Sequence, residues 1–186
     1  MNVLDAIRSR RSIRKFTERP MTSAELEPLL DAATLAPNHR LSQPWRFYVL
    51  GPEARAAYGL ALGHRKARKA VDEAEAQAVR EKTRDDHRAQ PCMLIVAQVL
   101  VESPEIREED YAATMMAVEN ICLAAVDAGL GTHIRTGAIM EDPAARAAVG
   151  LPDGERIVAV LTVGEPAELP PPKPRRPASE LTRWVN

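Results

Sequence analysis

The sequence predicts an α+β fold, with a central sheet that helices flank. Two nearly continuous apolar runs, residues 92–101 and 156–164, are typical of central strands buried on both faces. Segments with helical spacing alternate irregularly with strands, which disfavours a regular parallel strand–helix–strand wind. With 186 residues, 45% hydrophobic and 27% charged, the chain is expected to form one domain over residues 1–186 with a substantial core.

The N-terminal part is expected to contain two helices. Residues 2–10 place apolar side chains on one helical face. Thr22 offers an N-cap for a second helix that extends to about Leu35. The Ala36-Pro37 pair ends this helix, because proline disfavours the helical conformation of the residue before it.

A short strand and a charged excursion follow. Residues 45–50 form an apolar strand closed by Gly51-Pro52, and another helix opens at Pro52. Residues 64–88 mix both signs of charge without a strong apolar stripe. We expect an exposed helical segment there; a solvated helix with ion pairs is favoured over a lid that covers a ligand.

The second half combines one long helix with shorter elements. Residues 111–128 are apolar nearly all round, which predicts a helix buried on all sides, in the core or across a dimer interface. Gly129-Leu130-Gly131 ends this helix, with a glycine where a left-handed C-cap is expected. Residues 132–136 are expected to form a strand and residues 142–149 a short helix.

The C-terminal residues 165–186 are rich in proline and predict an extended, semi-rigid tail. Leu181, Trp184 and Val185 near its end are apolar anchors that a free tail would not need.

Composition excludes several classes of protein. The formal net charge of −1 disfavours nucleic-acid binding, which usually requires an extended basic face. Cys92 and Cys122 lie in apolar runs without CxxC spacing, so we expect small buried side chains in a reducing compartment. The N-terminus lacks the pattern of a secretory signal, and the apolar stretches are too short or interrupted to span a membrane. A cytoplasmic protein without a membrane partner is predicted.

Most catalytic motifs are absent from the sequence. The histidines show no zinc spacing, and neither the GxSxG elbow nor the P-loop occurs. Gly129-Leu130-Gly131 follows a helix, the reverse of the order in a dinucleotide fingerprint. Glu119-Asn120 interrupts the long apolar helix; a structural contact is favoured over a catalytic carboxylate. A chain without an evident acid/base pair suits an enzyme whose cofactor carries the chemistry.

Residues 10–16, Arg-Arg-Ser-Ile-Arg-Lys-Phe, are the most informative stretch. Cations at the end of a helix interact favourably with its dipole and need no ligand. A second stretch, residues 36–45 with the sequence Ala-Pro-Asn-His-Arg-Leu-Ser-Gln-Pro-Trp, shifts the balance. Together with residues 124–132, 135–137 and 163–166, these motifs resemble the FMN-dependent nitroreductase family, in its compact single-domain NAD(P)H branch, over nearly the whole chain.

The resemblance implies a nitroreductase-like fold with a central, mostly antiparallel mixed sheet flanked by helices, in a homodimer with an extended C-terminal tail. It also implies that FMN lies at the subunit interface. The cofactor-binding residues implied are Arg10, Arg11, Ser12, Arg14, Leu35, His39, Ile134, Arg135, Thr136, Lys173 and Arg175.

Each group of these residues has an implied role. Arg10 and Ser12 would face the phosphate, which arginine binds with paired donors, and Arg11 would contribute at least its backbone. Arg14 would lie by the pyrimidine edge, where a cation eases reduction of the flavin. The backbone of Arg135 and Thr136 would approach flavin N5.

Other roles depend on the rest of the chain. His39 would contact the flavin across the dimer. Lys173, with Arg175 or Arg176, would bring a basic pair to the phosphate; an ordinary cationic tail is the alternative. Residues 124–129 match a segment assigned to nicotinamide nucleotides, although packing explains these apolar residues equally well.

Two positions depart from the family pattern. Leu41 stands where an asparagine is frequent, which removes one hydrogen bond to the flavin, and Ile134 stands where close relatives carry a tryptophan. We therefore expect a changed pocket wall and an altered substrate preference.

The function implied is an FMN oxidoreductase with NAD(P)H as co-substrate and no catalytic side chain of its own. Hydride would pass through flavin N5 to a small electron-poor acceptor, a nitroaromatic, quinone or activated enone, in a ping-pong order. A flavin-binding sensor or carrier without turnover is the alternative, and a plain interaction module is a more distant one.

Overall fold

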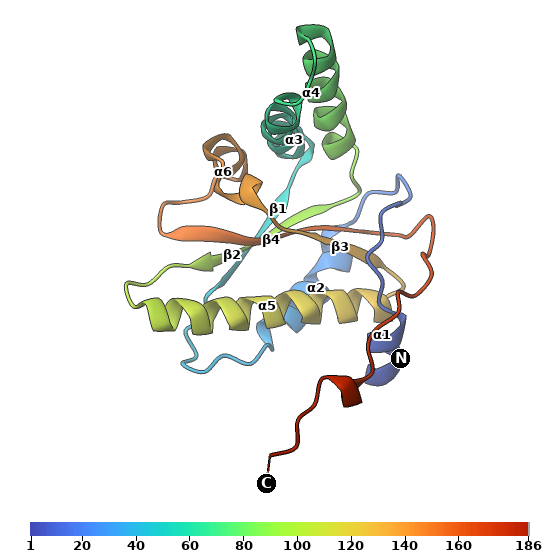
Figure 1. Cartoon of the computed structure of the whole chain (residues 1–186), viewed down its shortest axis with the longest axis vertical. Coiled ribbons are helices and arrows are strands. Elements are labelled where there is room, and N and C mark those ends of the chain that lie inside the picture. Colours follow the sequence, from blue (N-terminus) through green and yellow to red (C-terminus); the bar gives the residue numbers. More distant parts are fainter. Residues whose placement is uncertain (186) are drawn as a thin grey trace.

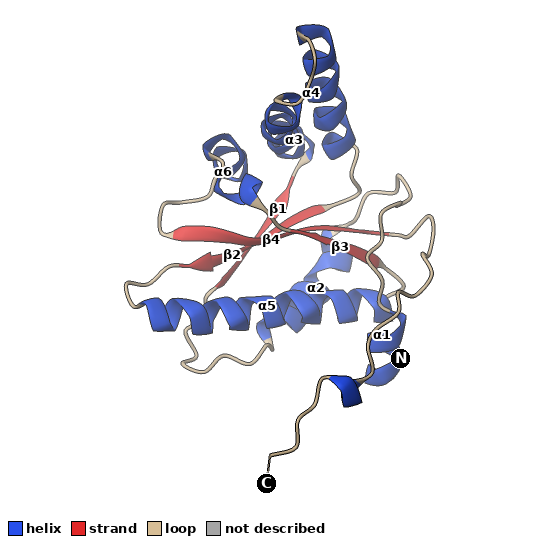
Figure 2. Ribbon diagram, viewed as in Figure 1, coloured by secondary structure: helices blue, strands red, loops and turns tan. Residues whose placement is uncertain are grey.

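One antiparallel sheet of four strands, in the order β1-β2-β4-β3, crosses the middle of the molecule in this computed structural model, which describes residues 1–185 (Figure 2). The strands are β1 (Trp45–Leu50), β2 (Met93–Val99), β3 (Gly131–Arg135) and β4 (Glu155–Gly164). Every neighbouring pair is antiparallel. The expectation of a mixed sheet was therefore wrong for the described strands: the parallel pairing is an isolated bridge from Ser12 to Thr132.

Helices cover both faces of this sheet (Figure 1). One layer contains α1 (Val3–Ser9), α2 (Ser23–Thr34) and α5 (Pro104–Asp127). The other contains α3 (Pro52–Ala67), α4 (Glu73–Arg88), α6 (Pro143–Val149) and the 3-10 turn Ala138–Glu141. Alternate strand residues enter the two resulting cores: Leu94 and Val96 face α2 and α5, while Met93 and Ile95 face α3 and α6. These layers confirm the predicted α+β class.

Local sequence signals explain where several elements begin. Thr22 and Glu25 form a reciprocal capping box at the start of α2, as the predicted cap requires. The long helix α5 begins at Pro104, earlier than the expected residue 111. Ser103 caps it and proline occupies its first position, but its charged first turns hide the apolar periodicity.

The side of α5 that faces away from the sheet differs from the prediction of burial all round. Ala117 and Ile121 are fully buried, whereas Tyr111 is 39% exposed and Met116 is 41% exposed. The prediction that this helix is buried on all sides was therefore wrong for the single chain. The alternative expectation, a dimer interface along this helix, remains a prediction.

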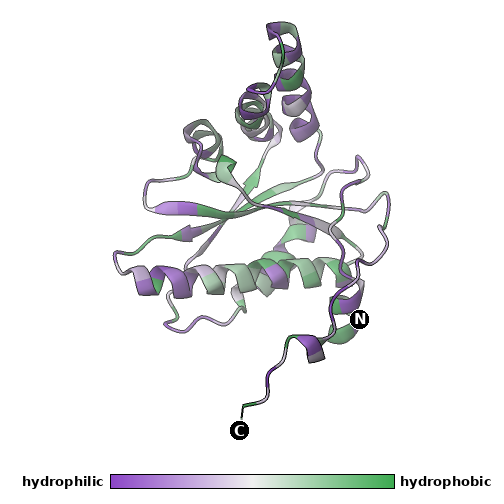
Figure 3. Ribbon diagram, in the orientation of Figure 1, coloured by the Kyte–Doolittle hydropathy of each residue, from purple (hydrophilic) through white to green (hydrophobic). Residues whose placement is uncertain are grey.

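The charged excursion over residues 64–88 is helical, as expected, but it consists of the end of α3 and the whole of α4. Much of α4 is hydrophilic, in contrast to the apolar stretches of the central strands (Figure 3). Two glycines of α3 allow a close approach to α4: a Cβ at Gly59 would lie 2.7 Å from His87 Cβ, and one at Gly63 would lie 2.9 Å from Arg80 Cα. The segment thus forms a packed helical hairpin, and a lid that covers a ligand stays the less favoured prediction.

The tail leaves the sheet after Glu165 and contains one short 3-10 turn, Ala178–Glu180, among its described residues. Its predicted anchors are exposed, with Trp184 at 90% and Val185 at 92%. Asn186, the last residue of the predicted tail, lies outside the described residues.

Both cysteines are buried small side chains, as predicted. Burial raises the pKa of Cys92 and of Cys122 to about 11, so neither thiol ionises readily. Within residues 1–185, no helix has the length and apolarity needed to cross a bilayer. The same residues contain no cluster of potential metal ligands.

The basic segment is fixed against β3 by a close packing contact. Ile13 is 2% exposed, and its backbone N–H donates to the Thr132 carbonyl at 2.9 Å. A methyl group at Gly131 would lie 2.5 Å from Ile13 Cγ1 and 3.0 Å from Pro166 Cγ. Only glycine at this position allows the segment to lie flat on the strand.

We therefore expect Gly131→Ala to lower the free energy of unfolding by about 1–3 kcal/mol, the usual cost of overpacking a tight contact. Urea denaturation measures this change. Gly154→Ala is the matched control, because a methyl group there meets no atom within 4 Å. Equal unfolding free energies for the two variants would contradict the packing argument.

Candidate flavin site

Residues 12–17 form an extended segment between β3 and the start of the tail. Besides the bond from Ile13 to Thr132, the Thr17 N–H donates to the Glu165 carbonyl at 3.0 Å. Alternate residues of an extended segment point to opposite sides. With Ile13 buried, Ser12 and Arg14 are both exposed. The segment thus presents a hydroxyl and a guanidinium to solvent from a fixed backbone.

The side chains of the two preceding arginines, Arg10 and Arg11, make different contacts. Arg10 Nε lies 3.5 Å from a Glu119 carboxylate oxygen, and the side chain of Arg10 is 26% exposed. Arg11 Nη1 donates to the carbonyls of Arg8 at 2.6 Å and Arg10 at 2.8 Å, so its guanidinium caps the end of α1. Of the two side chains, Arg10 is the better placed to bind an anion.

The Glu119-Asn120 pair makes structural contacts, as favoured from the sequence. Glu119 pairs with Arg10, and Asn120 Nδ2 donates to the Ala32 carbonyl at 3.0 Å, which ties α5 to α2.

Cationic groups gather around β3. Burial lowers the pKa of His133, and the charges of Arg135 and Arg14 lower it further. Burial also lowers the pKa of His87, where Arg135 and Lys66 add to the effect and Asp86 opposes it. Burial is the largest cause of both pKa shifts, and the nearby cations add a smaller contribution of positive charge beside the strand.

Arg135 turns its guanidinium into the protein. Its Nη2 donates to Gln90 Oε1 at 2.9 Å and to Thr162 Oγ1 at 2.6 Å. Ile134 faces the other layer and packs against the core beneath α5. Thr136 is exposed at the end of the strand, and Gly137 follows with φ of +134°, a conformation that favours glycine. The backbone of residues 135–137 is therefore the accessible part of this segment.

His39 belongs to a loop that is strained and firmly held. Leu41 and Gln43 have φ values of +50° and +46°, in the left-handed region. The Gln43 N–H donates to Asn38 Oδ1 at 2.8 Å, and Ser42 Oγ donates to Asp110 Oδ1 at 2.5 Å. Such strain persists only where surrounding contacts fix it, and it is frequent at functional sites.

The same loop contacts α5 through an ion-pair cluster. His39 Nδ1 lies 3.2 Å from Glu109 Oε1, and Arg40 Nε lies 3.0 Å from Glu109 Oε2. These two hydrogen bonds lower the pKa of Glu109. The side chain of His39 remains 71% exposed and accessible to a ligand.

One chain does not bring His39 to the basic segment. His39 contacts α5 at Glu109, whereas Arg10 contacts it at Glu119, and ten residues of α-helix span about 15 Å. Leu35, at the end of α2, is 81% exposed. The implied site residues thus form two separate groups, one near Glu109 and one near Glu119 of α5.

Among the described residues, no hydrogen bond or ion pair joins the cations of the tail to the basic segment. Lys173, Arg175 and Arg176 are exposed, and Arg175 Nη1 donates to its neighbouring Pro174 carbonyl at 3.4 Å. The expected basic pair at the phosphate is not assembled within the described chain.

A cleft of about 580 Å³ lies at the end of α5, and Ala124 and residues 127–129, from the segment 124–129 that the resemblance associated with nicotinamide nucleotides, line it together with Leu130. Three carboxylates, Glu25, Asp127 and Glu165, also line it. Arg19 pairs with Glu25 and Glu165, and the N-terminal amine pairs with Asp127, so these groups leave no surplus of positive charge to attract a pyrophosphate. Ala125 of the same segment is fully buried in the core. Both observations favour the packing interpretation of this segment.

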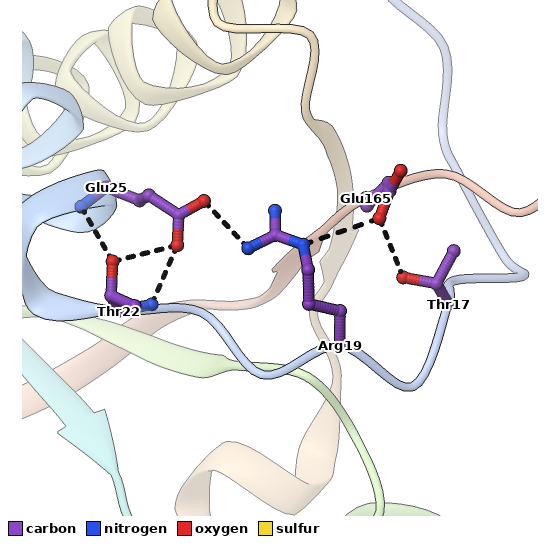
Figure 4. A network of polar contacts seen from close by, with 5 residues as sticks. All are labelled: Thr17, Arg19, Thr22, Glu25 and Glu165. Atoms are coloured by element: carbon purple, nitrogen blue, oxygen red, sulfur yellow. Dashed lines mark hydrogen bonds and ion pairs between the residues drawn. The ribbon is translucent and has the colours of Figure 1, made fainter.

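Arg19 is one of the residues that line this cleft, and Figure 4 shows its guanidinium between Glu25 and Glu165. It pairs with Glu25 at 2.8 Å and with Glu165 at 3.4 Å, and Thr17 Oγ1 donates to the same Glu165 oxygen at 3.2 Å. The network links the start of α2 to the end of β4. It therefore stabilises the turn that follows the basic segment.

Comparison with known proteins decides the family. The model described as Nitroreductase family matches residues 7–165. The chain belongs to the nitroreductase family. It is 35% identical to YfhC of Bacillus subtilis (strain 168) over 173 residues, 93% of this chain and 89% of YfhC.

Solved members of similar fold cover the whole chain. A nitroreductase-like family protein from Bacillus cereus has a TM-score of 0.85 and 30% identity, covering 100% of this chain and 96% of that one. A protein from Desulfovibrio desulfuricans, solved in complex with FMN, has a TM-score of 0.74 and 27% identity, covering 100% and 98%. These similarities confirm the nitroreductase-like fold.

Several residues that hold the candidate site in this family member were not predicted. Gln90 and Thr162 hold Arg135, and Asp110 holds the His39 loop. Asp110 is 2% exposed although charged. Its place just before the apolar run of α5 was the available signal, since a carboxylate at the border of a buried helix face needs a partner.

The Arg19 network makes acid stability depend on Glu25. Hydrogen bonds from the Thr22 backbone and side chain, with Arg19, lower the pKa of Glu25 to about 2. A depressed carboxyl pKa stabilises the fold above the unfolded-state value of about 4.3, and this contribution is lost as pH falls toward 2. We expect Glu25→Gln to lower the melting temperature at pH 7, with a difference from wild type that shrinks between about pH 5 and 2.

Thermal unfolding over a pH series measures this effect. Glu27→Gln on the same helix is the control, since Glu27 is exposed and its side chain makes no hydrogen bond or ion pair within residues 1–185. A constant difference between Glu25→Gln and wild type at all pH values would show that the carboxylate is not the stabilising group.

Proposed function

We propose that this protein is an FMN-dependent oxidoreductase that uses NAD(P)H. The observation that carries the proposal is the arrangement beside β3, where the paired segment at Ser12 and Ile13 presents the exposed Ser12 and Arg14 to a ligand. The Desulfovibrio desulfuricans relative was solved in complex with FMN, and the name of YfhC describes an NAD(P)H nitroreductase. Membership of the family supports the same chemistry here.

The phosphate end of FMN suits the N-terminal segment. Arg10 has one carboxylate neighbour, Glu119 at 3.5 Å, and enough exposure to exchange it for a phosphate. Ser12 adds a hydroxyl donor from a backbone that is paired with Thr132. A phosphate dianion binds best to such charge-assisted donors on a rigid backbone.

The ring end of FMN suits the far end of β3. Arg14 would place its charge by the pyrimidine edge, which stabilises the anionic reduced state. Thr136 and Gly137 offer backbone N–H groups beside a glycine with no Cβ, which permits close approach. Ile134 is partly buried and packs against the core on the side of α5.

The separation along α5 supports a homodimer with FMN at its interface. In this arrangement, His39 of the partner subunit and Leu35 of the partner subunit would complete the site formed by Arg10 and Ser12. Exposed apolar side chains on α5 and its surroundings, Leu35, Leu41, Tyr111 and Met116, offer surface for such an interface. The exposed tail, with Lys173 and Arg175, would reach the phosphate only after association.

When bound by Arg10, Ser12, Arg14 and the backbone of residues 135–137, FMN would supply hydride transfer through N5, from NAD(P)H to an electron-poor acceptor in a ping-pong order. The protein binds and orients the reactants, and needs no general base. Nitroaromatics, quinones and activated enones are the acceptor classes proposed.

The colour of the purified protein tests this function. We expect a yellow preparation that NADPH or NADH bleaches under anaerobic conditions, with colour restored by a quinone. A yellow protein that neither nucleotide bleaches would instead be a flavin carrier or sensor. Colourless protein that fails to bind added FMN would contradict both functions.

Replacement of Arg10 tests the phosphate site. We expect Arg10→Ala to weaken FMN binding by about 1.5–3 kcal/mol, as loss of a charged hydrogen-bond donor does. Flavin fluorescence titration measures the affinity. Arg8→Ala is the control, because Arg8 is an exposed arginine of α1 whose charge lies 3.9 Å from Asp5. Unchanged affinity in Arg10→Ala would remove this residue from the site.

A further inference from the structure

A small cavity of about 160 Å³ lies behind the accessible backbone of residues 135–137. Aliphatic side chains of α3, β4 and the 3-10 turn line much of it. Its polar wall is formed by Tyr58 from α3, His87 from α4 and Arg135 from β3. The cavity therefore joins the helical hairpin to the strand that carries the proposed flavin contacts.

Two polar atoms in this wall lack partners. Tyr58 is 2% exposed, and neither its hydroxyl oxygen nor Arg135 Nε has a hydrogen-bond partner or contact with solvent. Buried donors are almost always paired, because an unmade hydrogen bond leaves the cost of desolvation unrecovered. Both unpaired donors belong to residues that line the same cavity, which makes it the place where an acceptor could satisfy them.

The charge in the wall is also unbalanced. The guanidinium of Arg135 donates to two neutral side chains, Gln90 and Thr162. Burial raises the pKa of Tyr58 to about 12, so its hydroxyl keeps its proton and remains a donor. His87 Nδ1 lies 2.8 Å from the Thr83 carbonyl, which occupies that nitrogen. A buried guanidinium without a carboxylate partner favours an anionic ligand.

We propose that this cavity binds a small planar monoanion, an oxyanion or carboxylate of the size of nitrate or acetate, with the Arg135 Nε–H and the Tyr58 hydroxyl as donors. The size of the cavity defines this class: pockets for drug-sized ligands occupy about 300–1,000 Å³. This cavity shares Arg135 and Thr136 with the proposed flavin groove, but its other walls come from α3, α4, β4 and the 3-10 turn, which contribute no residue to that groove. A guanidinium matches the planar geometry of such anions.

Thermal unfolding of the full-length protein in increasing sodium nitrate tests the proposal. Ionic strength is held constant with sodium 2-(N-morpholino)ethanesulfonate, whose bulky anion does not fit the cavity. A ligand that binds the folded state raises the melting temperature in a saturable way. We expect this response in the wild type, and an apparent affinity for nitrate about tenfold or more weaker in Tyr58→Phe, which removes one donor and keeps the ring.

The matched control is Tyr111→Phe, because Tyr111 lies on α5 outside this cavity and is 39% exposed. It should respond to nitrate as the wild type does. Tyr58→Phe should remain folded without nitrate, since it removes a hydroxyl that has no partner. Circular dichroism of the variant checks its fold directly.

Two results would overturn the proposal. Equal responses of wild type and Tyr58→Phe would place the anion elsewhere, such as on the exposed arginines near the N-terminus. Absence of any saturable response would show that the cavity binds no such anion. Neither result affects the proposed oxidoreductase function, which the reduction of bound flavin tests independently, and colourless protein with a saturable nitrate response would retain the anion site alone.

Discussion

The pairing of the N-terminal segment with β3 is the contact on which the candidate site depends. One backbone hydrogen bond, from Ile13 to Thr132, and one buried side chain fix the direction of the residues on either side. Because Ile13 enters the core, Ser12 and Arg14 must face outward beside the strand. Gly131 permits this approach, and Pro166 packs on the same spot from the tail. A local packing constraint thus determines which polar groups a ligand meets.

The second constraint is the burial of Arg135. Taking a guanidinium out of water costs free energy, and burial accordingly lowers the pKa of Arg135. Gln90 and Thr162 recover part of this cost through hydrogen bonds but supply no charge. The uncompensated charge is felt by His87, His133 and Tyr58. An anion near β3, in the proposed flavin groove or in the cavity behind it, would balance a charge that the fold itself leaves unpaired.

Most of the fold was predictable because its signals are local. The capping box at Thr22 fixes the start of α2, and the bounds of β1 follow from an apolar run ended by Gly51. The early start of α5 at Pro104 was missed, since its first turns are charged and carry no apolar period. Exposure on α5 was also missed, because composition alone does not distinguish a core helix from one with a surface reserved for a partner.

The candidate site was less predictable, because its contacts join distant parts of the sequence. The family resemblance selected the basic segment and His39, but no local pattern indicates that His39 contacts Glu109. The inward turn of Arg135 depends on the pairing of β3 with β4, which places Arg135 opposite Val160. The sequence identifies residues whose side chains could bind a ligand, whereas the sheet register determines which groups those side chains contact.

The two groups of site residues on α5 have a simple geometric relation to the proposed dimer. A two-fold axis brings the same surface of both chains together, so a helix at the axis meets its copy with opposite ends aligned. If the axis crosses α5 between Glu109 and Glu119, the His39 end of one chain lies beside the Arg10 end of the other. Tyr111 and Met116, both exposed, lie within this interval. The proposed dimer would then explain both the exposed apolar surface of α5 and the division of the site into two groups.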